Sequence, residues 1–212
     1  MTGGRPSPHA YSCPGPVVVC MEYALAIENA PESVPAGTGV LLVHPSTAQT
    51  DRIDTDFLKT DTDHLLVVST RTTAREVEQK LEHYEVDEDS ATILDAISVE
   101  RGYTRRQSDR VQYVSAPDNL DAVIDRVEAF LDSHEGKLRV SVDSITEMVY
   151  YADETRAIAA VEDLLELLAE YDAVGLFHLA RGVHEDDTVA SFSELFDGVV
   201  ELDEDGAVTA RF

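Results

Sequence analysis

The feature that most constrains the fold of this chain is an alternation, from residue 39 onward, of short apolar runs with amphipathic helical patterns. The runs are rich in Val, Leu and Ile, and strands of this kind lie in sheets that are covered on both faces. The alternation is typical of βαβ units around a largely parallel sheet. We therefore expect strands at Val40–His44, Leu65–Ser69, Thr92–Leu94, Val111–Val114, Leu138–Val142, Ala173–His178 and Gly198–Leu202, with a further candidate at Ala207–Phe212.

Three segments between these runs have the apolar spacing of helices that face a core. They are TTAREVEQKLEHY (residues 72–84), DNLDAVIDRVEAFLDSH (118–134) and the segment Thr155–Tyr171. Their apolar residues recur every three or four positions, so we assign these stripes to packing and give them no role in ligand binding.

Charge excludes some classes of partner. The chain has 212 residues, 42 of them acidic and 16 basic, and its formal net charge is −26. Such a charge repels nucleic acid and anionic membrane surfaces, so we expect neither as a partner. Lysine occurs only three times, and the acidic residues are spread along the whole chain, a composition that resembles proteins of salt-in halophiles.

The first residues are different in composition. Residues 1–20 contain four prolines and both cysteines, Cys13 and Cys20, without an apolar segment of the kind that secretory signals need. We expect a flexible extension over residues 1–33, of which 1–20 precede Met21 and are a candidate mis-called start, and one domain over residues 34–212. The chain has no run of about 18 apolar residues, so we expect a cytoplasmic protein without membrane insertion.

The segment LRVSVDSIT (138–146) is an apolar strand that ends in Asp143 and Ser144. It resembles the Walker B strand of RecA-type P-loop ATPases, in particular the KaiC-like branch. The preceding YVSAPDNLDAVIDRVEAFL and the following VGLFHLARGVHEDDTVASFSELFDGVVELD also resemble that branch, so that the similarity covers roughly residues 34–205. It implies an α/β fold, a RecA-like three-layer sandwich with a mostly parallel central sheet. The chain also resembles a haloarchaeal family labelled transducer-like, or HTR-like.

The resemblance implies a phosphate-binding loop, G-x-x-x-x-G-K-[ST], after the first strand. The corresponding segment LLVHPSTAQTD (41–51) has no glycine and no lysine. Pro45 removes a backbone donor, and Asp51 places negative charge where a phosphate would lie. The hydroxyls of Ser46, Thr47 and Thr50 remain, and they can cap a helix or bind Mg²⁺.

A second ATPase element is also missing. KaiC-like ATPases carry catalytic glutamates after the next strand, where LLVVSTRTTAREV offers Arg71 and Thr72. We therefore expect a pseudo-ATPase with no catalytic residues and no hydrolysis of ATP with Mg²⁺, and we leave open whether a nucleotide binds. The degenerate nucleotide-site positions are Ser46, Thr47, Thr50, Arg71, Asp143 and Ser144.

Residues 101–110, RGYTRRQSDR, concentrate positive charge in an otherwise acidic chain. Arginine binds carboxylates and phosphates through two parallel hydrogen bonds, so the loop is a candidate interaction patch for a protein partner or a second copy of the chain. The alternative is a surface loop that pairs with the protein's own carboxylates. The candidate patch comprises Arg101, Tyr103, Arg105, Arg106 and Arg110.

Histidines raise the question of a metal. His44, Asp143 and His178 all end or follow predicted strands, and ligands of open α/β sheets bind at that edge. A histidine at the end of a strand more often forms hydrogen bonds within the fold, so we expect no metal site. Ser144 lacks the G-x-S-x-G context of a hydrolase nucleophile, and we assign it to a helix cap.

These observations favour a non-catalytic RecA/KaiC-like domain that acts as a regulatory or protein-interaction module. The alternative is a sensor that binds a nucleotide or another anion in a non-standard pocket, with Arg71 in place of the missing lysine.

Overall fold

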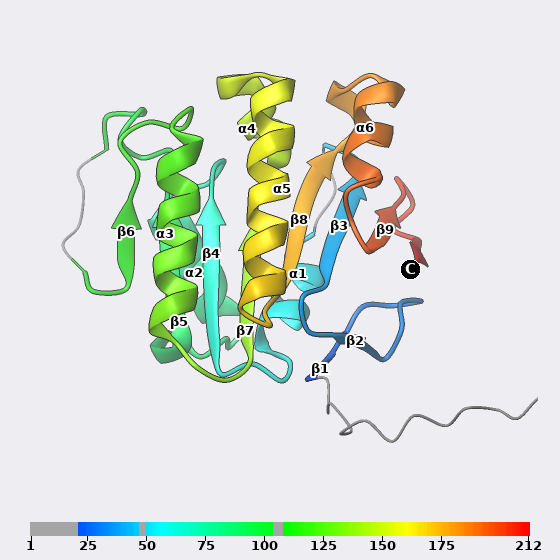
Figure 1. Cartoon of the computed structure of the whole chain (residues 1–212), viewed down its shortest axis with the longest axis horizontal. Helices are drawn as coiled ribbons and strands as arrows, with labels where there is room; N and C mark the ends of the chain where they lie inside the picture. The colour runs from blue at the N-terminus through cyan, green and yellow to red at the C-terminus, as the bar shows by residue number, and fades with distance from the viewer. Residues whose placement is uncertain (1–20, 47–49, 104–107) are drawn as a thin grey trace, which may run out of the picture.

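A computed structural model of the chain describes residues 21–46, 50–103 and 108–212. Its centre is an eight-stranded sheet in the order β10-β9-β3-β8-β7-β4-β5-β6 (Figure 1). All neighbouring strands are parallel except β9 and β10. The strands are Gly39–His44 (β3), His64–Ser69 (β4), Ala91–Asp95 (β5), Val111–Tyr113 (β6), Leu138–Val142 (β7), Val174–Ala180 (β8), Gly198–Leu202 (β9) and Val208–Arg211 (β10).

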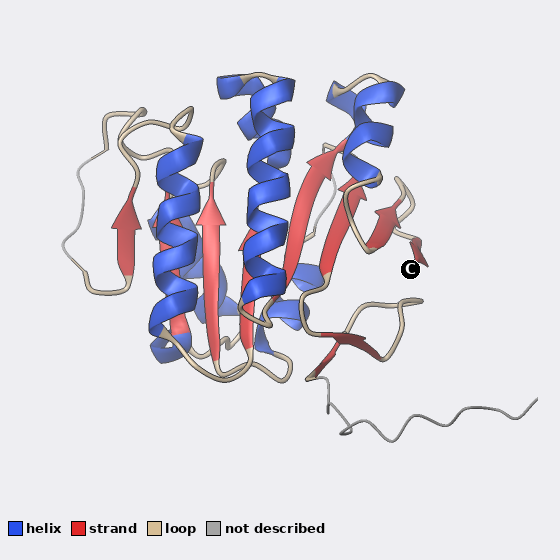
Figure 2. Ribbon diagram, in the orientation of Figure 1, coloured by secondary structure: helices blue, strands red, loops and turns tan. Residues whose placement is uncertain are grey.

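Helices cover both faces of the sheet (Figure 2). One face carries α3 (Leu120–Ser133), α4 (Ile145–Ala152), α5 (Glu154–Glu170) and α6 (Asp186–Ser193). The other face carries α1 (Asp51–Lys59) and α2 (Ala74–His83). The short 3-10 helices η1 and η2 span Glu88–Ser90 and Arg181–Val183. The expected three-layer α/β sandwich with a mostly parallel sheet is therefore confirmed.

Strand β3 shows why the apolar runs form strands in this fold. All six of its residues are buried. Leu41 and Val43 lie in the core beneath α3 to α6, whereas Val40 and Leu42 lie in the core beneath α1 and α2. Because successive side chains of a strand point to opposite faces, a strand between two helical layers is buried on both faces and is mostly apolar.

Side-chain caps fix the starts of the helices. Thr73 and Glu76 form a capping box at the start of α2, in which each side chain binds the backbone N–H of the other residue. Asn119 caps α3, and Ser144 caps α4 by accepting a hydrogen bond from the N–H of Glu147, as we expected for Ser144. None of the helices in the described segments has the length and apolar content to cross a bilayer.

The segment that follows Met21 corrects one expectation. We expected residues 1–33 to form a flexible extension, but Glu22–Ala24 (β1) and Ser33–Pro35 (β2) pair as an antiparallel hairpin. Tyr23 is fully buried, and its hydroxyl donates to the carbonyl of Asp172 at 2.8 Å and accepts from the N–H of Leu138 at 3.0 Å. Residues 21–33 therefore belong to the domain, because their apolar side chains complete the core on the α1–α2 face. The expectation for residues 1–20 lies outside the described residues.

The hairpin covers a buried arginine. The Nη2 atom of Arg139, on β7, donates to the carbonyl of Ala24 at 2.6 Å, and the guanidinium lies 4.7 Å from the ring centre of Phe57. Burial lowers the pKa of Arg139 to about 10. Its Nε and Nη1 atoms have no hydrogen-bond partner within the described part of the chain.

The connections define two places where a ligand site is expected. Strand β3 leads to α1 on one face, whereas its neighbour β8 leads to α6 on the other. In the same way, β4 leads to α2, whereas its neighbour β7 leads to α4 on the opposite face. In open α/β sheets, ligands bind beyond the carboxyl ends of strands where the connections diverge in this manner. The loops after β3, β4, β7 and β8 meet at this edge.

Candidate functional site

Asp143, the residue after β7, accepts hydrogen bonds from the loop that follows β4. Its Oδ1 atom accepts from the backbone N–H groups of Thr70, at 2.7 Å, and Arg71, at 3.1 Å. Its Oδ2 atom accepts from the hydroxyl of Thr72 at 2.8 Å and from the N–H of Thr72 at 3.3 Å. The hydroxyls of Ser69 and Thr70 lie within 3.1 Å of the same carboxylate. A carboxylate has about four acceptor positions, so these donors occupy Asp143 fully.

Arg71 lies in the loop that Asp143 holds. Its side chain is half-buried and lines a cavity of about 50 Å³ together with Thr50, Asp54, Lys80 and His178. The guanidinium of Arg71 makes no hydrogen bond or ion pair with any residue of the described segments. Two of the predicted positions, Arg71 and Thr50, are therefore brought to one cavity with Asp143.

Acidic side chains lie at the start of α1, the helix that follows β3. Asp54, in the first turn of α1, has its Oδ1 atom 2.5 Å from Nε2 of His178 on β8, and the two form an ion pair when His178 is protonated. Thr50 donates to the other oxygen of Asp54 at 3.2 Å. Lys80 pairs with Asp51 at 2.7 Å. The first turn of α1, which attracts anions, therefore already carries two carboxylates.

The pKa values at this edge follow from burial and from these pairs. Burial raises the pKa of Asp54, but the attraction of His178, with further help from Lys80 and Thr50, outweighs burial, so the net shift is downward. Burial lowers the pKa of His44, and the neighbouring His178 adds to that shift. The rings of His44 and His178 are 5.4 Å apart in an edge-to-face arrangement.

The remaining predicted positions do not join this cluster. Ser46 lies in the loop after β3 and is exposed, and Ser144 serves α4 as its cap. Thr47 lies outside the described residues. Within the described segments, no three His, Cys, Asp or Glu side chains converge as metal ligands. His184 instead approaches the hydroxyl of Thr146 at 3.0 Å.

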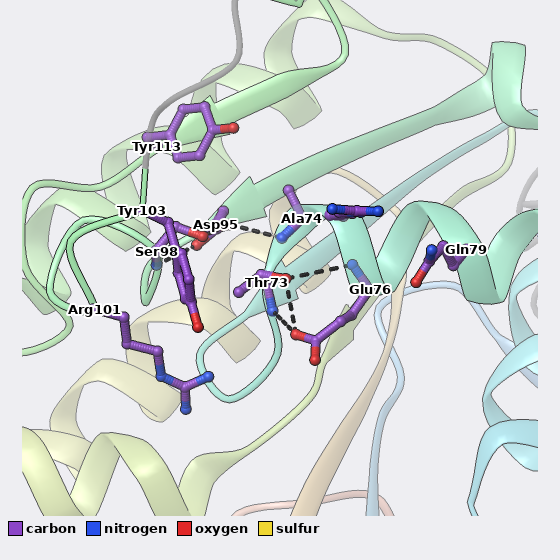
Figure 3. A pocket seen from close by; sticks show the side chains of 10 residues that line it. Thr73, Ala74, Glu76, Gln79, Asp95, Ser98, Arg101, Tyr103 and Tyr113 are labelled. Atoms are coloured by element: carbon purple, nitrogen blue, oxygen red, sulfur yellow. Dashed lines mark hydrogen bonds between the residues drawn. The ribbon is translucent and has the colours of Figure 1, made fainter.

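A second cluster lies beside α2, at the carboxyl ends of β5 and β6 (Figure 3). A pocket of about 530 Å³ is lined there by Arg101 and Tyr103 of the predicted interaction patch, and by Arg75, Asp95 and residues near them. Asp95, which ends β5, is fully buried. Its carboxylate accepts from the N–H groups of Ala74, Ile97 and Ser98 and from the hydroxyl of Ser98, at 2.6 to 3.0 Å.

The structure separates the residues of the predicted arginine patch. Arg110 precedes β6 and binds Glu88, near the amino end of β5, with its Nη1 atom 2.7 Å from the carbonyl and 3.3 Å from the carboxylate. Arg101 and Tyr103 lie at the carboxyl end of β5. Arg105 and Arg106 lie outside the described residues. Arg110 therefore fits the alternative prediction, in which the arginines pair with the protein's own carboxylates.

Sequence reasoning missed Asp95, Asp54 and Arg75. A signal for Asp95 was available, because ATILD is an apolar run that ends in Asp, as RVSVD does at Asp143. Asp54 and Arg75 lie among other charged residues near the starts of α1 and α2, where the sequence pattern gives no indication of a special role.

The fold and this edge define a class of protein. The sheet has eight strands and carries helices on both faces, and one strand, β8, lies between β3 and β7, the strand that Asp143 follows. This is the arrangement of a RecA-like α/β fold. A KaiC-like protein from the hyperthermophilic archaeon Pyrococcus horikoshii OT3 matches with a TM-score of 0.62 at 16% identity, over 90% of this chain and 86% of that chain.

Two further solved structures share the fold. An ATPase from the type III secretion system of pathogenic bacteria matches 97% of this chain with a TM-score of 0.58 at 13% identity, and this chain covers 66% of that protein. A second protein from Pyrococcus horikoshii OT3 matches with a TM-score of 0.59 at 10% identity, over 82% of this chain and 86% of that chain. No curated protein matches the sequence. The chain belongs to the family described as "Family of unknown function (DUF7090)", which matches residues 21–212.

Proposed function

We propose that this chain is a non-catalytic RecA/KaiC-like domain that acts as a regulatory or protein-interaction module in the cytoplasm of a halophilic archaeon. The observation that carries the proposal is the state of Asp143. A carboxylate that assists Mg²⁺ in phosphoryl transfer needs free acceptor positions, and Asp143 gives its positions to the loop of residues 69–72.

The surrounding residues do not fit the phosphates of ATP either. The loop after β3 supplies no glycine and no lysine, and Asp51 and Asp54 lie in the first turn of the helix that follows. The loop after β4 offers Thr70, Arg71 and Thr72 and no carboxylate to activate water. We therefore derive no step of catalysis through a nucleotide or a metal ion.

The test is an assay for ATP hydrolysis by the full chain in about 2–3 M KCl, where the Debye length is only a few ångströms. We expect no turnover above that of a sample without protein. Turnover that disappears in the Asp143→Asn variant, but persists in the Arg110→Gln variant, whose substitution lies far from Asp143, would overturn the proposal. Circular dichroism of both variants checks that each is folded.

The second candidate function is an anion sensor, and one observation favours it. The guanidinium of Arg71 makes no hydrogen bond or ion pair in the described segments, although it lines a cavity with Lys80 and Thr50 and attracts Glu147. An unpaired guanidinium is a ready donor pair for phosphate. The cavity of about 50 Å³ accommodates a small ion and not a whole nucleotide without rearrangement.

Calorimetry with inorganic phosphate and with ATP tests this candidate. Binding that disappears in Arg71→Glu would support a sensor, and Arg126→Glu, on the exposed side of α3, is the matched control. The same heat of binding in the wild type and in Arg71→Glu would count against it.

The role as an interaction module has its own test. We expect a homo-oligomer or a complex with another protein, and light scattering after size-exclusion chromatography measures the mass. Arg101→Glu combined with Arg105→Glu should lower the mass of a homo-oligomer. A wild-type chain that is monomeric and captures no protein partner would leave the interaction role without support.

A further inference from the structure

The pocket beside α2 is separate from the cavity that contains Arg71. The two share no lining residue, although both contact α2. Its volume of about 530 Å³ lies in the range of pockets that bind small molecules in proteins, about 300–1,000 Å³.

Both walls of this pocket are held by one buried carboxylate. Asp95 accepts from the N–H of Ala74, at the start of α2, and from the N–H groups of Ile97 and Ser98 in the loop after β5. The same loop continues to Tyr103, whose N–H donates to the carbonyl of Ser98 at 2.9 Å. The helix and the loop are therefore fixed relative to each other before any ligand binds, which lowers the entropic cost of binding.

The pocket offers guanidinium groups that form no hydrogen bond within the described residues, although Arg101 attracts the carboxylates of Glu76 and Glu147. Its two acidic residues already accept from the protein, since Asp95 binds the backbone and Oε2 of Glu76 accepts from the N–H and the hydroxyl of Thr73 at 2.7 and 2.8 Å. The guanidinium groups of Arg75 and Arg101 make no hydrogen bond or ion pair with any part of the chain that the structure describes. In a chain of net charge −26, two such arginines at one pocket favour an anion.

The pocket also offers aromatic rings. Tyr103 is 58% exposed, and its side chain extends beside Arg101 in the close view, with Tyr113 above it and α2 across from both (Figure 3). Exposed aromatic rings stack on planar ligands, and such stacking depends little on salt.

A second cavity shows that this combination is not general in the molecule. The cavity of about 700 Å³ between α1 and β10 is lined by four acidic residues, and its one arginine, Arg52, pairs with Asp56 at 3.6 Å. That cavity disfavours anions, so the arginines and tyrosines single out the pocket beside α2.

We propose that this pocket binds a small anion that carries a planar ring, a nucleoside monophosphate or an aromatic carboxylate. Arg75 and Arg101 hold the anionic group, and Tyr103 stacks on the ring. The binding does not depend on whether the chain hydrolyses ATP, so it goes beyond the function proposed above.

Isothermal titration calorimetry on the full chain in about 2 M KCl tests the proposal, with AMP, 4-hydroxybenzoate and inorganic phosphate as probes. We expect saturable binding of AMP or of 4-hydroxybenzoate, and much weaker binding of phosphate, which has no ring. Arg101→Gln and Tyr103→Leu should each weaken that binding about tenfold, because one loses a charged donor pair and the other a stacking surface. Arg110→Gln, whose arginine is bound to Glu88, is the matched control and should leave the affinity unchanged.

The outcomes separate the ligand classes and the sites. Binding of AMP alone identifies a phosphorylated ligand, and binding of 4-hydroxybenzoate alone identifies a carboxylate. Either result supports the proposed binding in the pocket when Arg101→Gln weakens the affinity for that probe. No saturation by either ring-bearing probe up to about 10 mM, a very weak affinity for a protein site, would overturn the proposal. Binding that is lost in Arg71→Gln but kept in Arg101→Gln would also overturn it, since the ligand would then lie in the other cavity.

Discussion

At the scale of single residues, Asp143 holds the loop between β4 and α2 through several hydrogen bonds. Three backbone N–H groups of the β4–α2 loop, those of Thr70, Arg71 and Thr72, depend on its carboxylate. Asp143→Ala leaves these donors without an acceptor, and we expect the free energy of unfolding to fall by about 2–4 kcal/mol. Urea denaturation measures it, with Asp132→Ala, an exposed position on α3, as the control. A loss as small as that of the control would show that the loop does not depend on Asp143.

His44 gives a second prediction at this scale, on pH dependence. Burial lowers its pKa below 6.5, His178 and Arg71 act in the same direction, and the carbonyl of Pro45 and Asp54 oppose them. As the pH falls through 6.5, the unfolded chain takes up a proton that the folded chain resists, so the His44 contribution to stability is lost. His44→Gln removes this contribution.

Urea denaturation between about pH 7.5 and pH 5.5 checks the prediction, because this window contains the ordinary pKa of histidine. The free energy of unfolding should fall less steeply with decreasing pH in His44→Gln than in the wild type. His83→Gln, at an exposed histidine on α2, serves as the control. Equal slopes in the wild type and in His44→Gln would contradict the prediction.

At the scale of elements, the N-terminal hairpin depends on one hydroxyl. Tyr23→Phe keeps the buried ring but removes a donor to Asp172 and an acceptor for Leu138. We expect a loss of about 1–3 kcal/mol in the free energy of unfolding, since the N–H of the buried Leu138 is left without its acceptor and the carbonyl of Asp172 loses its donor. Urea denaturation measures the loss, and Tyr150→Phe, at a tyrosine that is 77% exposed, is the control. An unchanged stability of Tyr23→Phe would mean that the hairpin is not part of the cooperative unit.

The elements also show what the sequence can predict. The runs Leu138–Val142 and Gly198–Leu202 match β7 and β9 at both ends, because central strands that are covered on both faces are rich in Val and Leu, even where β7 includes the buried Arg139. The hairpin of β1 and β2 escaped prediction because each strand has three residues, too few for a period, and because the burial of Tyr23 depends on partners more than 100 residues away.

The candidate site was predictable to a similar degree. Asp143 and Asp95 end apolar runs, and that position alone places them at the carboxyl edge of a parallel sheet. Which groups occupy their oxygens could not be predicted, because the donors to Asp143 come from residues more than 70 positions earlier. The pocket beside α2 likewise forms from segments around Thr73, Asp95 and Tyr113 that no local pattern connects.

At the scale of the whole molecule, the net charge of −26 predicts a dependence on salt. Screening shortens the reach of the repulsion between carboxylates, from about 10 Å at 0.1 M to a few ångströms at molar salt. We expect the melting temperature to rise by about 10 °C between 0.1 M and 2 M KCl, equivalent to a few kcal/mol for a chain of this length. Differential scanning fluorimetry measures the shift, and sucrose at matched osmotic strength controls for effects other than screening. A melting temperature that does not change between 0.1 M and 2 M KCl would contradict the proposed halophilic setting.

The hydrogen bonds of Asp143 have a consequence for the history of the fold. Under the proposal that this chain is a pseudo-ATPase, an ancestor that hydrolysed ATP would have had a loop after β4 that left this carboxylate free to bind a metal ion. Glycines and a lysine introduced after β3 would provide donors for a phosphate. The carboxylate of Asp143, which would have to bind the metal ion, would still accept hydrogen bonds from Thr70, Arg71 and Thr72. Under the proposed loss of activity, a variant designed to hydrolyse ATP would therefore need changes in two separate loops, the one after β3 and the one of residues 69–72.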